Sequence, residues 1–504
     1  MDTAVVHPSY RNPILDADWP DPDAVRVGDD FYMTVSSFNR APGLPVLHSR
    51  DLVNWRIVSH AVPALEPAAH YALPRHGAGV WAPSIRHHDG VFHIVYPDPD
   101  QGIWVVSTRD PHGEWDAPRL LIAGLGLIDP CPLWDDDGSA YLVHGWAASR
   151  AGRKNRLDVI PVDAGLTRAV GPGCVVVDGA DLDGYGTLEG PKFYKRDGWY
   201  WIFAPAGGVA TGWQSVFRSR SVYGPYEDRI VLAQGETEVN GPHQGAWVDT
   251  AERGDWFLHF QDRGPYGRVV HLQPMTWTDD GWPVIGVARA GSTTGEPVIE
   301  HPSPWPTPQG PRTLTASEDF SSGVDPRWHW QGNPGRDWAV AAGGRLRLVG
   351  PANDTGNVRT LPQVLGQVVP GFAATFRTSV SLGGGEGARA GVTVLGRAYV
   401  WAGLRLTPEG PRLQVARRTE GALTEVLVLD EAAHSTATDI AVHLSSTGEI
   451  SVDIGQRTLS GIAPLVAGHW IGAEYGLFAA APLGSDRQAV AEFGPIDVEL
   501  FDGQ

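Results

Sequence analysis

Short apolar and aromatic segments recur along the first 290 residues, each placed behind a polar turn. The first is Asp30-Phe31-Tyr32, and similar segments follow the Asp-Gly pairs at 89–90, 137–138 and 197–198. Asp-Gly between two apolar runs is a strong local signal for a β-hairpin. Corresponding positions in successive repeats are 48 to 60 residues apart: 21, 81, 129, 189 and 243. This period is typical of propeller blades. The pattern predicts a five-bladed β-propeller.

The pattern changes beyond residue 290. A Gly, Ser and Thr segment leads into Pro302, Pro304, Pro306 and Pro308, a composition typical of a semi-rigid linker. Farther on, longer alternating strands are expected, among them 398–406, 440–444 and 474–478, and no helical period of any length is present. We therefore expect an all-β protein with a propeller domain over 1–290, a linker over 291–313 and a β-sandwich over 314–504.

Three carboxylates occupy the same position in their repeats. Asp21, Asp129 and Glu189 each precede a hairpin turn by 9 residues, and a proline follows each within two residues. Trp81 holds this position in the second repeat, and His243 lies 11 residues before the turn glycine of the fifth. Because the innermost strand of every blade lines the central channel, this position should face one mouth of the channel in each repeat. We expect the three acids to converge there.

Converging acids suit the hydrolysis of a glycosidic bond, which requires a proton donor together with a base or a nucleophile. A third carboxylate beside the donor would raise the pKa of the donor through like-charge repulsion. An aspartate before proline is also a common turn residue that bonds to its own backbone, so Asp21 and Asp129 each have a structural explanation. Glu189 lacks that explanation, because glutamate is a poor turn residue.

Composition narrows the partners of this 504-residue chain. The formal charge of −19 disfavours nucleic acid and anionic membranes. No run of about 18 apolar residues and no basic leader with an apolar stretch is present, so we expect a cytoplasmic protein that does not enter a membrane. Cys131 and Cys174 imply no disulfide framework and are expected to be small buried side chains. Twenty tryptophans suit stacking against sugar rings as well as ordinary packing.

The motifs at the repeated position resemble glycoside hydrolase family 43, the family of five-bladed propeller β-xylosidases and α-L-arabinofuranosidases. Four segments carry the resemblance: Trp19-Pro20-Asp21-Pro22-Asp23, Trp81-Ala82-Pro83, Ile128-Asp129-Pro130 and Glu189-Gly190-Pro191. The resemblance implies that Asp21 is the general base, that Glu189 is the proton donor and that Asp129 tunes the donor. It also implies inversion of configuration, for which the two acting carboxyl groups lie roughly 6.5 to 9.5 Å apart.

The resemblance implies further residues of the sugar site. Phe38 and Trp81 are similar to aromatic walls around the terminal sugar, with blade packing as the alternative. Arg268 is similar to an arginine that binds sugar hydroxyls, with a solvated surface position as the alternative. His243 is similar to an axial histidine often associated with a hydrated calcium ion in the channel. Calcium takes about 6 to 8 oxygen ligands, so a histidine hydrogen-bonded within the channel is the alternative.

The C-terminal part resembles the concanavalin-like β-sandwich attached to one branch of this family, in which a loop closes one side of the pocket. Segment 328–334, which includes Trp330, is the candidate for this loop, and packing at the domain interface is the alternative. Val209 stands where some β-xylosidases of the family carry a threonine, so the preference between xylose and arabinose is open.

The expected function is that of an exo-acting, inverting hydrolase that removes terminal β-D-xylosyl or α-L-arabinofuranosyl units from plant-derived oligosaccharides. No cofactor is required beyond a possible structural calcium ion, and a homo-oligomer is possible. One alternative is a non-catalytic, lectin-like protein whose acids bind sugar hydroxyls. A fructan hydrolase is the other, because such enzymes use the tripeptide found at Arg109-Asp110-Pro111. That tripeptide lies late in its repeat, which argues against the second alternative.

Overall fold

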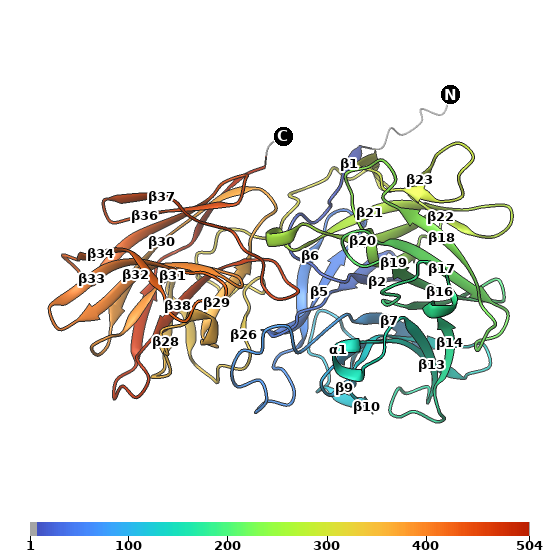
Figure 1. Cartoon of the computed structure of the whole chain (residues 1–504), viewed down its shortest axis with the longest axis horizontal. Coiled ribbons are helices and arrows are strands. Elements are labelled where there is room, and N and C mark those ends of the chain that lie inside the picture. The colour runs from blue at the N-terminus through green and yellow to red at the C-terminus, as the bar shows by residue number, and fades with distance from the viewer. Residues whose placement is uncertain (1–7, 503–504) are drawn as a thin grey trace.

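The computed structural model describes residues 8–502 and divides them into a propeller and a sandwich that lie side by side (Figure 1). Five sheets follow one another along the propeller part, each built on an antiparallel meander of four strands. The first strand of one sheet contacts the first strand of another in the pairs 23–27 with 84–88, 84–88 with 127–134, and 127–134 with 192–196. The fifth sheet closes the ring, because its strand 243–249 contacts strand 23–27. The five-bladed propeller is confirmed.

The strands of the blades run in chain order across each sheet. Their bounds are β2 (Asp23–Val27), β3 (Asp30–Thr34), β5 (Gly43–Ser49) and β6 (Arg56–Val62) in blade 1; β7 (Ser84–His88), β8 (Val91–Asp98), β9 (Gly102–Thr108) and β10 (Arg119–Ala123) in blade 2; β11 (Leu127–Trp134), β12 (Ala140–Trp146), β13 (Arg156–Val162) and β14 (Cys174–Asp178) in blade 3; β15 (Lys192–Arg196), β16 (Trp199–Ala206), β17 (Trp213–Ser219) and β18 (Glu227–Ala233) in blade 4; and β19 (His243–Asp249), β20 (Asp255–Asp262), β21 (Arg268–Trp277) and β22 (Pro283–Ile285) in blade 5.

The predicted hairpins form where the Asp-Gly pairs stand. At 89–90 and 197–198 both residues have positive φ, 49° and 74° in the first and 53° and 69° in the second. This is the two-residue turn whose twist matches antiparallel strands. Apolar side chains on the faces of each sheet then pack against the next blade, as Phe203 and Val216 of blade 4 do against Phe257 and Met275 of blade 5.

The sandwich consists of two stacked antiparallel sheets around one apolar core. The larger sheet contains β27 (Ala339–Ala342), β28 (Arg345–Gly350), β39 (Ala489–Phe493), β30 (Ala373–Gly383), β35 (Ala437–Leu444), β36 (Glu449–Ile454), β37 (Arg457–Pro464) and β40 (Asp497–Phe501). The smaller sheet contains β29 (Val364–Val368), β38 (Glu474–Ala480), β31 (Arg389–Leu395), β32 (Tyr399–Thr407), β33 (Gly410–Arg418) and β34 (Val426–Ala432). The three expected strands named above lie within β32, β35 and β38 to within one residue.

Helices are few and short in the described part of the chain. They are α1 (Ala148–Ala151) and the 3-10 turns η1 (Gly179–Asp181), η2 (Gly264–Tyr266) and η3 (Val358–Thr360). Across residues 8–502, no helix has the length and apolar character needed to cross a bilayer.

The segment between the two domains stays close to the propeller. β23 (Val287–Ala288) and β24 (Gly295–Glu296) extend the sheet of blade 4, in which Leu232 pairs with Gly295. β25 (Glu300–Pro302) pairs with β1 (Ser9–Arg11). Backbone pairing therefore holds much of this proline-rich segment against the first domain, although its composition predicts a linker.

Trp330 belongs to the contact between the domains. β26 (Trp330–Gln331) pairs with β4 (Arg40–Ala41), and the following Gly332 N–H donates to the Asn39 carbonyl at 2.7 Å. The Trp330 side chain packs against apolar clusters of both domains. The interface alternative for segment 328–334 is the observed one.

The two cysteines differ in exposure, so the expectation that both are buried is wrong for one of them. Cys131 is fully buried, with its Sγ 3.1 Å from the Phe193 N–H donor and 2.9 Å from Arg86 Nη2. Cys174 begins β14, the last strand of its blade, and is exposed.

We expect a maleimide reagent to label one thiol per native chain and two in denaturant, because only Cys174 is open to solvent. Mass spectrometry of the labelled protein counts the adducts. The matched control, Cys174→Ser, should take no label while native, and rapid labelling of that variant would contradict the burial of Cys131.

Candidate active site

A cavity of about 100 Å³ opens at the mouth of the propeller channel, where the inner strands begin. It is lined by Asp21, Phe38, Trp81, Ala82, Ile128, Asp129, Glu189, Gln244, Arg268 and Trp470. The three predicted acids therefore converge, together with three of the predicted sugar-binding residues. Trp330 and Val209 do not line this cavity.

The backbone at this mouth is bent in the same way in several blades. Asp21, Asp129 and Gln244 have φ values of 56°, 55° and 39°, in the left-handed region that few residues other than glycine adopt. In β11 the pairing register shifts between Ile128 and Cys131, and in β19 it shifts between His243 and Gly245. Such irregularities turn a side chain away from the face of the sheet to which the regular alternation would assign it. They explain how residues at strand starts point into one cavity.

Asp21 is held on both oxygens. Arg268 Nη1 donates to Asp21 Oδ1 at 2.9 Å and to Oδ2 at 3.2 Å, and Ser36 Oγ donates to Oδ2 at 2.5 Å. The Arg268 guanidinium also lies over the Phe260 ring, 4.8 Å from its centre. Arg268 is buried, so the solvated surface alternative is wrong. The Asp21 carboxylate is thus fixed in one orientation.

Glu189 is the acid most open to the cavity, with 29% of its side chain exposed against 4% for Asp21. Its Oε1 lies 3.1 Å from His243 Nε2, so the axial histidine orients it. Gly190 has φ 62°, and its N–H donates to Asp129 Oδ2 at 2.8 Å. A Cβ at Gly190 would lie 2.8 Å from Gln244 Cγ, which explains the glycine after the glutamate.

Burial and charge repulsion both disfavour the ionised form of Asp129. Burial is the main cause that raises its pKa to about 7, and repulsion from Glu189 and then from Asp21 adds to the rise. The Gly190 N–H and the buried Lys192 ammonium act in the opposite direction. Lys192 Nζ donates to the Pro83 carbonyl at 2.6 Å and to Ser84 Oγ at 2.9 Å, so it acts on Asp129 through its charge. Asp129 therefore keeps its proton up to a pH near 7.

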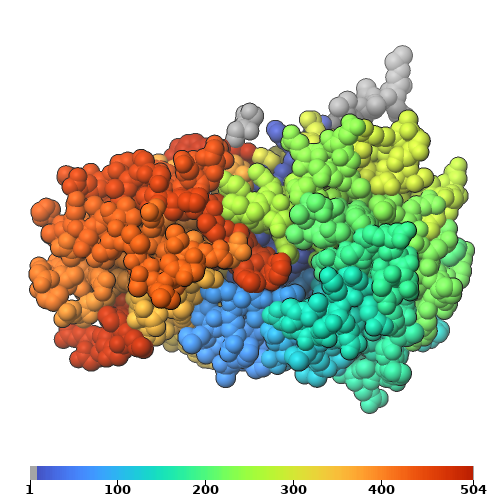
Figure 2. Space-filling model, in the orientation of Figure 1, coloured from blue at the N-terminus to red at the C-terminus, as the bar shows by residue number. Residues whose placement is uncertain are grey.

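Aromatic side chains wall the cavity. The Phe38 backbone pairs with that of Val80, and its ring centre lies 6.1 Å from that of Trp81. The Trp470 ring lies edge-on to Trp81 at 6.3 Å. Trp470 comes from the sandwich, in the loop between β37 and β38. In Figure 2 a red projection of the sandwich reaches the edge of the propeller. The pocket is completed by the second domain.

The sequence indicated 328–334 as the closing loop, whereas the sandwich residue that lines the cavity is Trp470. Trp470 has φ 67° and is 49% exposed, which is unusual for tryptophan. Its sequence context, a tryptophan between Gly468 and Gly472 in a short segment between two strands, was the available signal. Ser36 and Gln244 were also missed, because neither stands at the repeated position of a carboxylate.

The surroundings of His243 do not fit a calcium site made by protein ligands. Its Nδ1 is buried without a hydrogen-bond partner, but residues 8–502 contain no group of three or more His, Cys, Asp and Glu side chains placed to hold a metal. Calcium requires several oxygen ligands. His243 instead meets Glu189 through Nε2 and the Phe260 ring edge-on at 5.7 Å.

A propeller whose mouth holds three carboxylates between aromatic walls defines a carbohydrate-cleaving hydrolase. Residues 10–283 match the glycosyl hydrolases family 43, and residues 317–499 match the β-xylosidase C-terminal concanavalin A-like domain. The chain belongs to glycoside hydrolase family 43.

Relatives at the sequence level support this membership. A protein of Xylanibacter ruminicola is 39% identical over 407 residues, which cover 79% of this chain and 72% of that protein. A β-xylosidase of Formosa agariphila is 33% identical over 65% of this chain and 59% of its own length. A non-reducing end α-L-arabinofuranosidase of Bacteroides ovatus is 31% identical over 55% of this chain and 54% of its own length. The last two matches thus span less than two thirds of those relatives.

Solved structures share the fold over nearly the whole chain. The family 43 protein of Bacillus licheniformis superposes with a TM-score of 0.84 and 23% identity, covering 98% of this chain and 100% of its own. Xylan β-1,4-xylosidase of Bacillus halodurans gives 0.84 and 23%, covering 97% and 99%. The arrangement of propeller and sandwich is therefore shared.

We expect Asp129→Asn to be more stable than the native protein at pH 8. Because burial and repulsion raise the pKa of Asp129 to about 7 in the folded state, its favourable contribution is complete below about pH 4 and is lost as the pH rises through 7. Asparagine keeps an acceptor for the Gly190 N–H and carries no charge. Each pKa unit corresponds to about 1.4 kcal/mol. We therefore expect the free energy of unfolding at pH 8 to rise by at most about 2 to 4 kcal/mol.

Thermal unfolding at pH 4 and pH 8 measures this effect. The control is Asp89→Asn in an exposed turn, whose side chain is 90% exposed, and it should leave the midpoint unchanged at both pH values. An Asp129→Asn midpoint at pH 8 equal to or below that of the native protein would contradict the raised pKa assigned to this acid.

Proposed function

We propose that this protein is an exo-acting, inverting hydrolase that removes a terminal β-D-xylosyl or α-L-arabinofuranosyl unit from plant-derived oligosaccharides. The observation that carries the proposal is the convergence of Asp21, Asp129 and Glu189 in one small pocket that Trp470 closes. Family membership establishes a glycosidase, and the pocket supports the exo mode and the size of the sugar. The names of the relatives support the two pentoses as candidates.

The walls of the pocket argue for one sugar unit. The cavity is small, about 100 Å³, and aromatic side chains of both domains bound it. An internal stretch of a polymer needs a groove that is open at both ends, whereas Trp470 bounds this cavity from the sandwich side. Phe38, Trp81 and Trp470 supply flat apolar surfaces against which a sugar ring packs, and the rest of the substrate must leave through the open side.

The chemistry follows from the positions of the acids. Asp21 takes a proton from a water molecule, whose oxygen forms the new bond to the anomeric carbon. The bond from that carbon to the leaving oxygen breaks, and Glu189 gives its proton to the leaving oxygen. Asp129 lies close enough to Glu189 for the two acids to repel each other when both are charged, so a charge on Asp129 opposes a second charge beside it. Arg268 and Ser36 hold Asp21 toward its water.

The two alternatives receive less support. Arg109-Asp110-Pro111 follows β9, the third strand of its blade, and Asp110 is exposed outside the pocket. The tripeptide therefore has no part in a fructan-type site here. A lectin-like function would not need three carboxylates in one pocket, and it predicts binding of sugars without turnover.

Glu189→Gln should lose activity on xylo- or arabino-oligosaccharides by about 10² to 10⁴-fold, because a general acid contributes on this scale. The loss should be much smaller on nitrophenyl glycosides, since nitrophenolate leaves with little help from a proton. Asp21→Asn should lose activity on both substrates alike, because the water must be activated in either case. Steady-state kinetics of the two variants on the two substrate classes measure this contrast.

Proton NMR of the first product gives a second readout. We expect the sugar to appear first in the anomeric form opposite to that of the substrate. Retention of configuration would contradict the role of Asp21 as the base, and sugar binding without turnover by the native protein would favour the lectin-like alternative.

Treatment with EDTA should leave the rate unchanged, because the proposed steps use only side chains of the chain itself. Hydrolysis rates before and after dialysis against the chelator measure this. A loss that calcium restores would instead support a hydrated calcium ion beside His243.

A further inference from the structure

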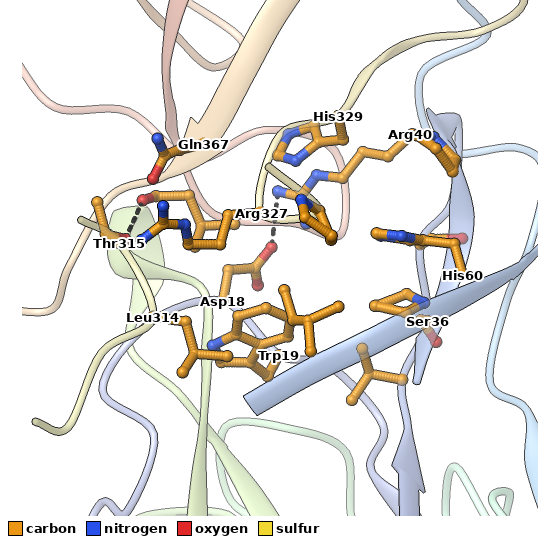
Figure 3. Close-up of a pocket in the computed structure, with 17 residues that line it drawn as sticks. Asp18, Trp19, Ser36, Arg40, His60, Leu314, Thr315, Arg327, His329 and Gln367 are labelled. Carbon is orange, nitrogen blue, oxygen red and sulfur yellow. Dashed lines mark hydrogen bonds and ion pairs between the residues drawn. The ribbon is translucent and has the colours of Figure 1, made fainter. Parts of the chain in front are cut away.

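A small cavity of about 40 Å³ lies between the two domains (Figure 3). Asp18, Ser36 and Arg40 of the propeller line it, and His329 of the sandwich lines it from the other side. Figure 3 shows the Arg40 and His329 side chains close together, with a dashed line from the Arg40 guanidinium to Asp18. Charged groups thus meet at a buried boundary between the domains.

These groups form a continuous ionic network. Arg40 Nη2 lies 2.9 Å from Asp18 Oδ2, and Arg40 Nε donates to Glu474 Oε1 at 2.5 Å. His329 Nε2 lies 3.0 Å from the same Glu474 oxygen. None of the four side chains is more than 10% exposed. The sandwich contributes Glu474 and His329, and the propeller contributes Arg40 and Asp18.

The network depends on its partners. Burial would raise the pKa of Glu474, but His329 and Arg40 outweigh it and lower the pKa to about 2. Removing one partner of a buried ion pair leaves an uncompensated charge, which is strongly destabilising. Arg40 binds a carboxylate on each side, so its position is set by both domains at once.

The network continues to the catalytic pocket through Asp18. Asp18 Oδ1 accepts the Arg268 backbone N–H at 3.0 Å, and the neighbouring Trp19 N–H donates to the Arg268 carbonyl at 2.9 Å. A Cβ at Gly267 would lie 2.1 Å from Asp18 Oδ1, so Asp18 fits directly against this backbone. The Arg268 side chain then binds both oxygens of Asp21.

We propose that Glu474 of the sandwich is a positioning residue for the catalytic base. Glu474 fixes Arg40, Arg40 fixes Asp18, and Asp18 fixes the backbone from which Arg268 reaches Asp21. The second domain therefore contributes to the reaction on the side of the base, in addition to closing the pocket with Trp470. This inference rests on the proposed function, because it takes Asp21 as the base.

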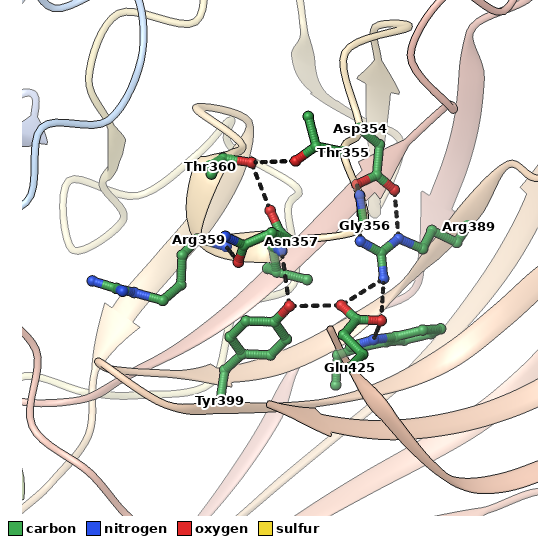
Figure 4. Close-up of polar contacts among 11 residues, drawn as sticks. Asp354, Thr355, Gly356, Asn357, Arg359, Thr360, Arg389, Tyr399 and Glu425 are labelled. Atoms are coloured by element: carbon green, nitrogen blue, oxygen red, sulfur yellow. Dashed lines mark hydrogen bonds and ion pairs between the residues drawn. The ribbon is translucent and has the colours of Figure 1, made fainter. Parts of the chain in front are cut away.

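The test compares Glu474→Gln with a matched control in the same sandwich. Glu425 is also a carboxylate bound to a buried arginine, with Arg389 Nη1 at 2.9 Å from each of its oxygens (Figure 4). Figure 4 shows Arg389 between Glu425 and Asp354, with the Tyr399 hydroxyl bonded to Glu425. Among the described residues, neither Glu425 nor Arg389 bonds to Asp18, Arg268 or Asp21. Glu425→Gln is therefore a control for the loss of a buried ion pair alone.

We expect Glu474→Gln to lower kcat by about 10 to 100-fold, because a small displacement of a catalytic group has an effect of this order. KM should change less than about threefold, because the aromatic walls that hold the sugar remain. Glu425→Gln should leave both constants unchanged while it lowers the thermal midpoint. Kinetics on a nitrophenyl glycoside and thermal unfolding give the three readouts.

Asp18→Asn tests the same connection from the propeller side. It should reproduce the loss in kcat, and combining it with Glu474→Gln should lower kcat no further than the stronger single variant, because both act through one network. Glu474 lies four residues from Trp470, and a shift of that loop is a separate explanation. Asp18 is distant from the loop in the chain, so agreement between the two variants supports the network.

Three results would overturn the proposal. One is a Glu474→Gln variant that keeps kcat within twofold and loses only stability, as Glu425→Gln does. The others are an effect on KM alone, and independent, multiplying effects of Glu474→Gln and Asp18→Asn. A native protein without activity on any xyloside or arabinofuranoside would refute the proposed function instead, so the two failures are distinguishable.

Discussion

Like charges held together in a buried place are the central constraint of this protein. Three carboxylates meet at one mouth of the propeller. Burial raises the pKa of Asp129 to about 7, and repulsion from Glu189 and Asp21 adds to the rise. The protein offsets this with fixed donors: Arg268 and Ser36 on Asp21, the Gly190 N–H on Asp129, and His243 on Glu189. Preorganised donors of this kind are the usual source of catalytic power in enzymes.

The sandwich is coupled to this constraint at two places. Trp470 forms one wall of the pocket, and Glu474 joins the buried charges that lead to Arg268. Trp470 lies in the loop before β38, and Glu474 is the first residue of that strand. A shift of the domain interface would therefore alter pocket shape and base orientation together, which gives a physical reason for two domains that share a fold with relatives over nearly their whole length.

Much of the fold was predictable because a propeller repeats. The same local pattern, a turn followed by an aromatic strand, recurs five times. Each copy therefore indicates which position of its inner strand faces the channel. Asp21, Asp129 and Glu189 were found by that repetition, and hairpins at 89–90 and 197–198 confirmed it through their backbone angles. Cys174 and Trp330 show the limits, because exposure and interface packing depend on neighbours that no local pattern identifies.

The sequence by itself determined the blade repeat, the two domain types and the three acids, since each depends on periodicity or on a motif of adjacent residues. Only the tertiary structure decided which sandwich loop closes the pocket and that Glu474 connects to Asp21. Trp470 and Phe38 are more than 400 residues apart in the chain and share a cavity only after the domains dock. Contacts between the two domains depend on how their surfaces pack against each other. Such packing leaves no periodic pattern in the sequence of either domain.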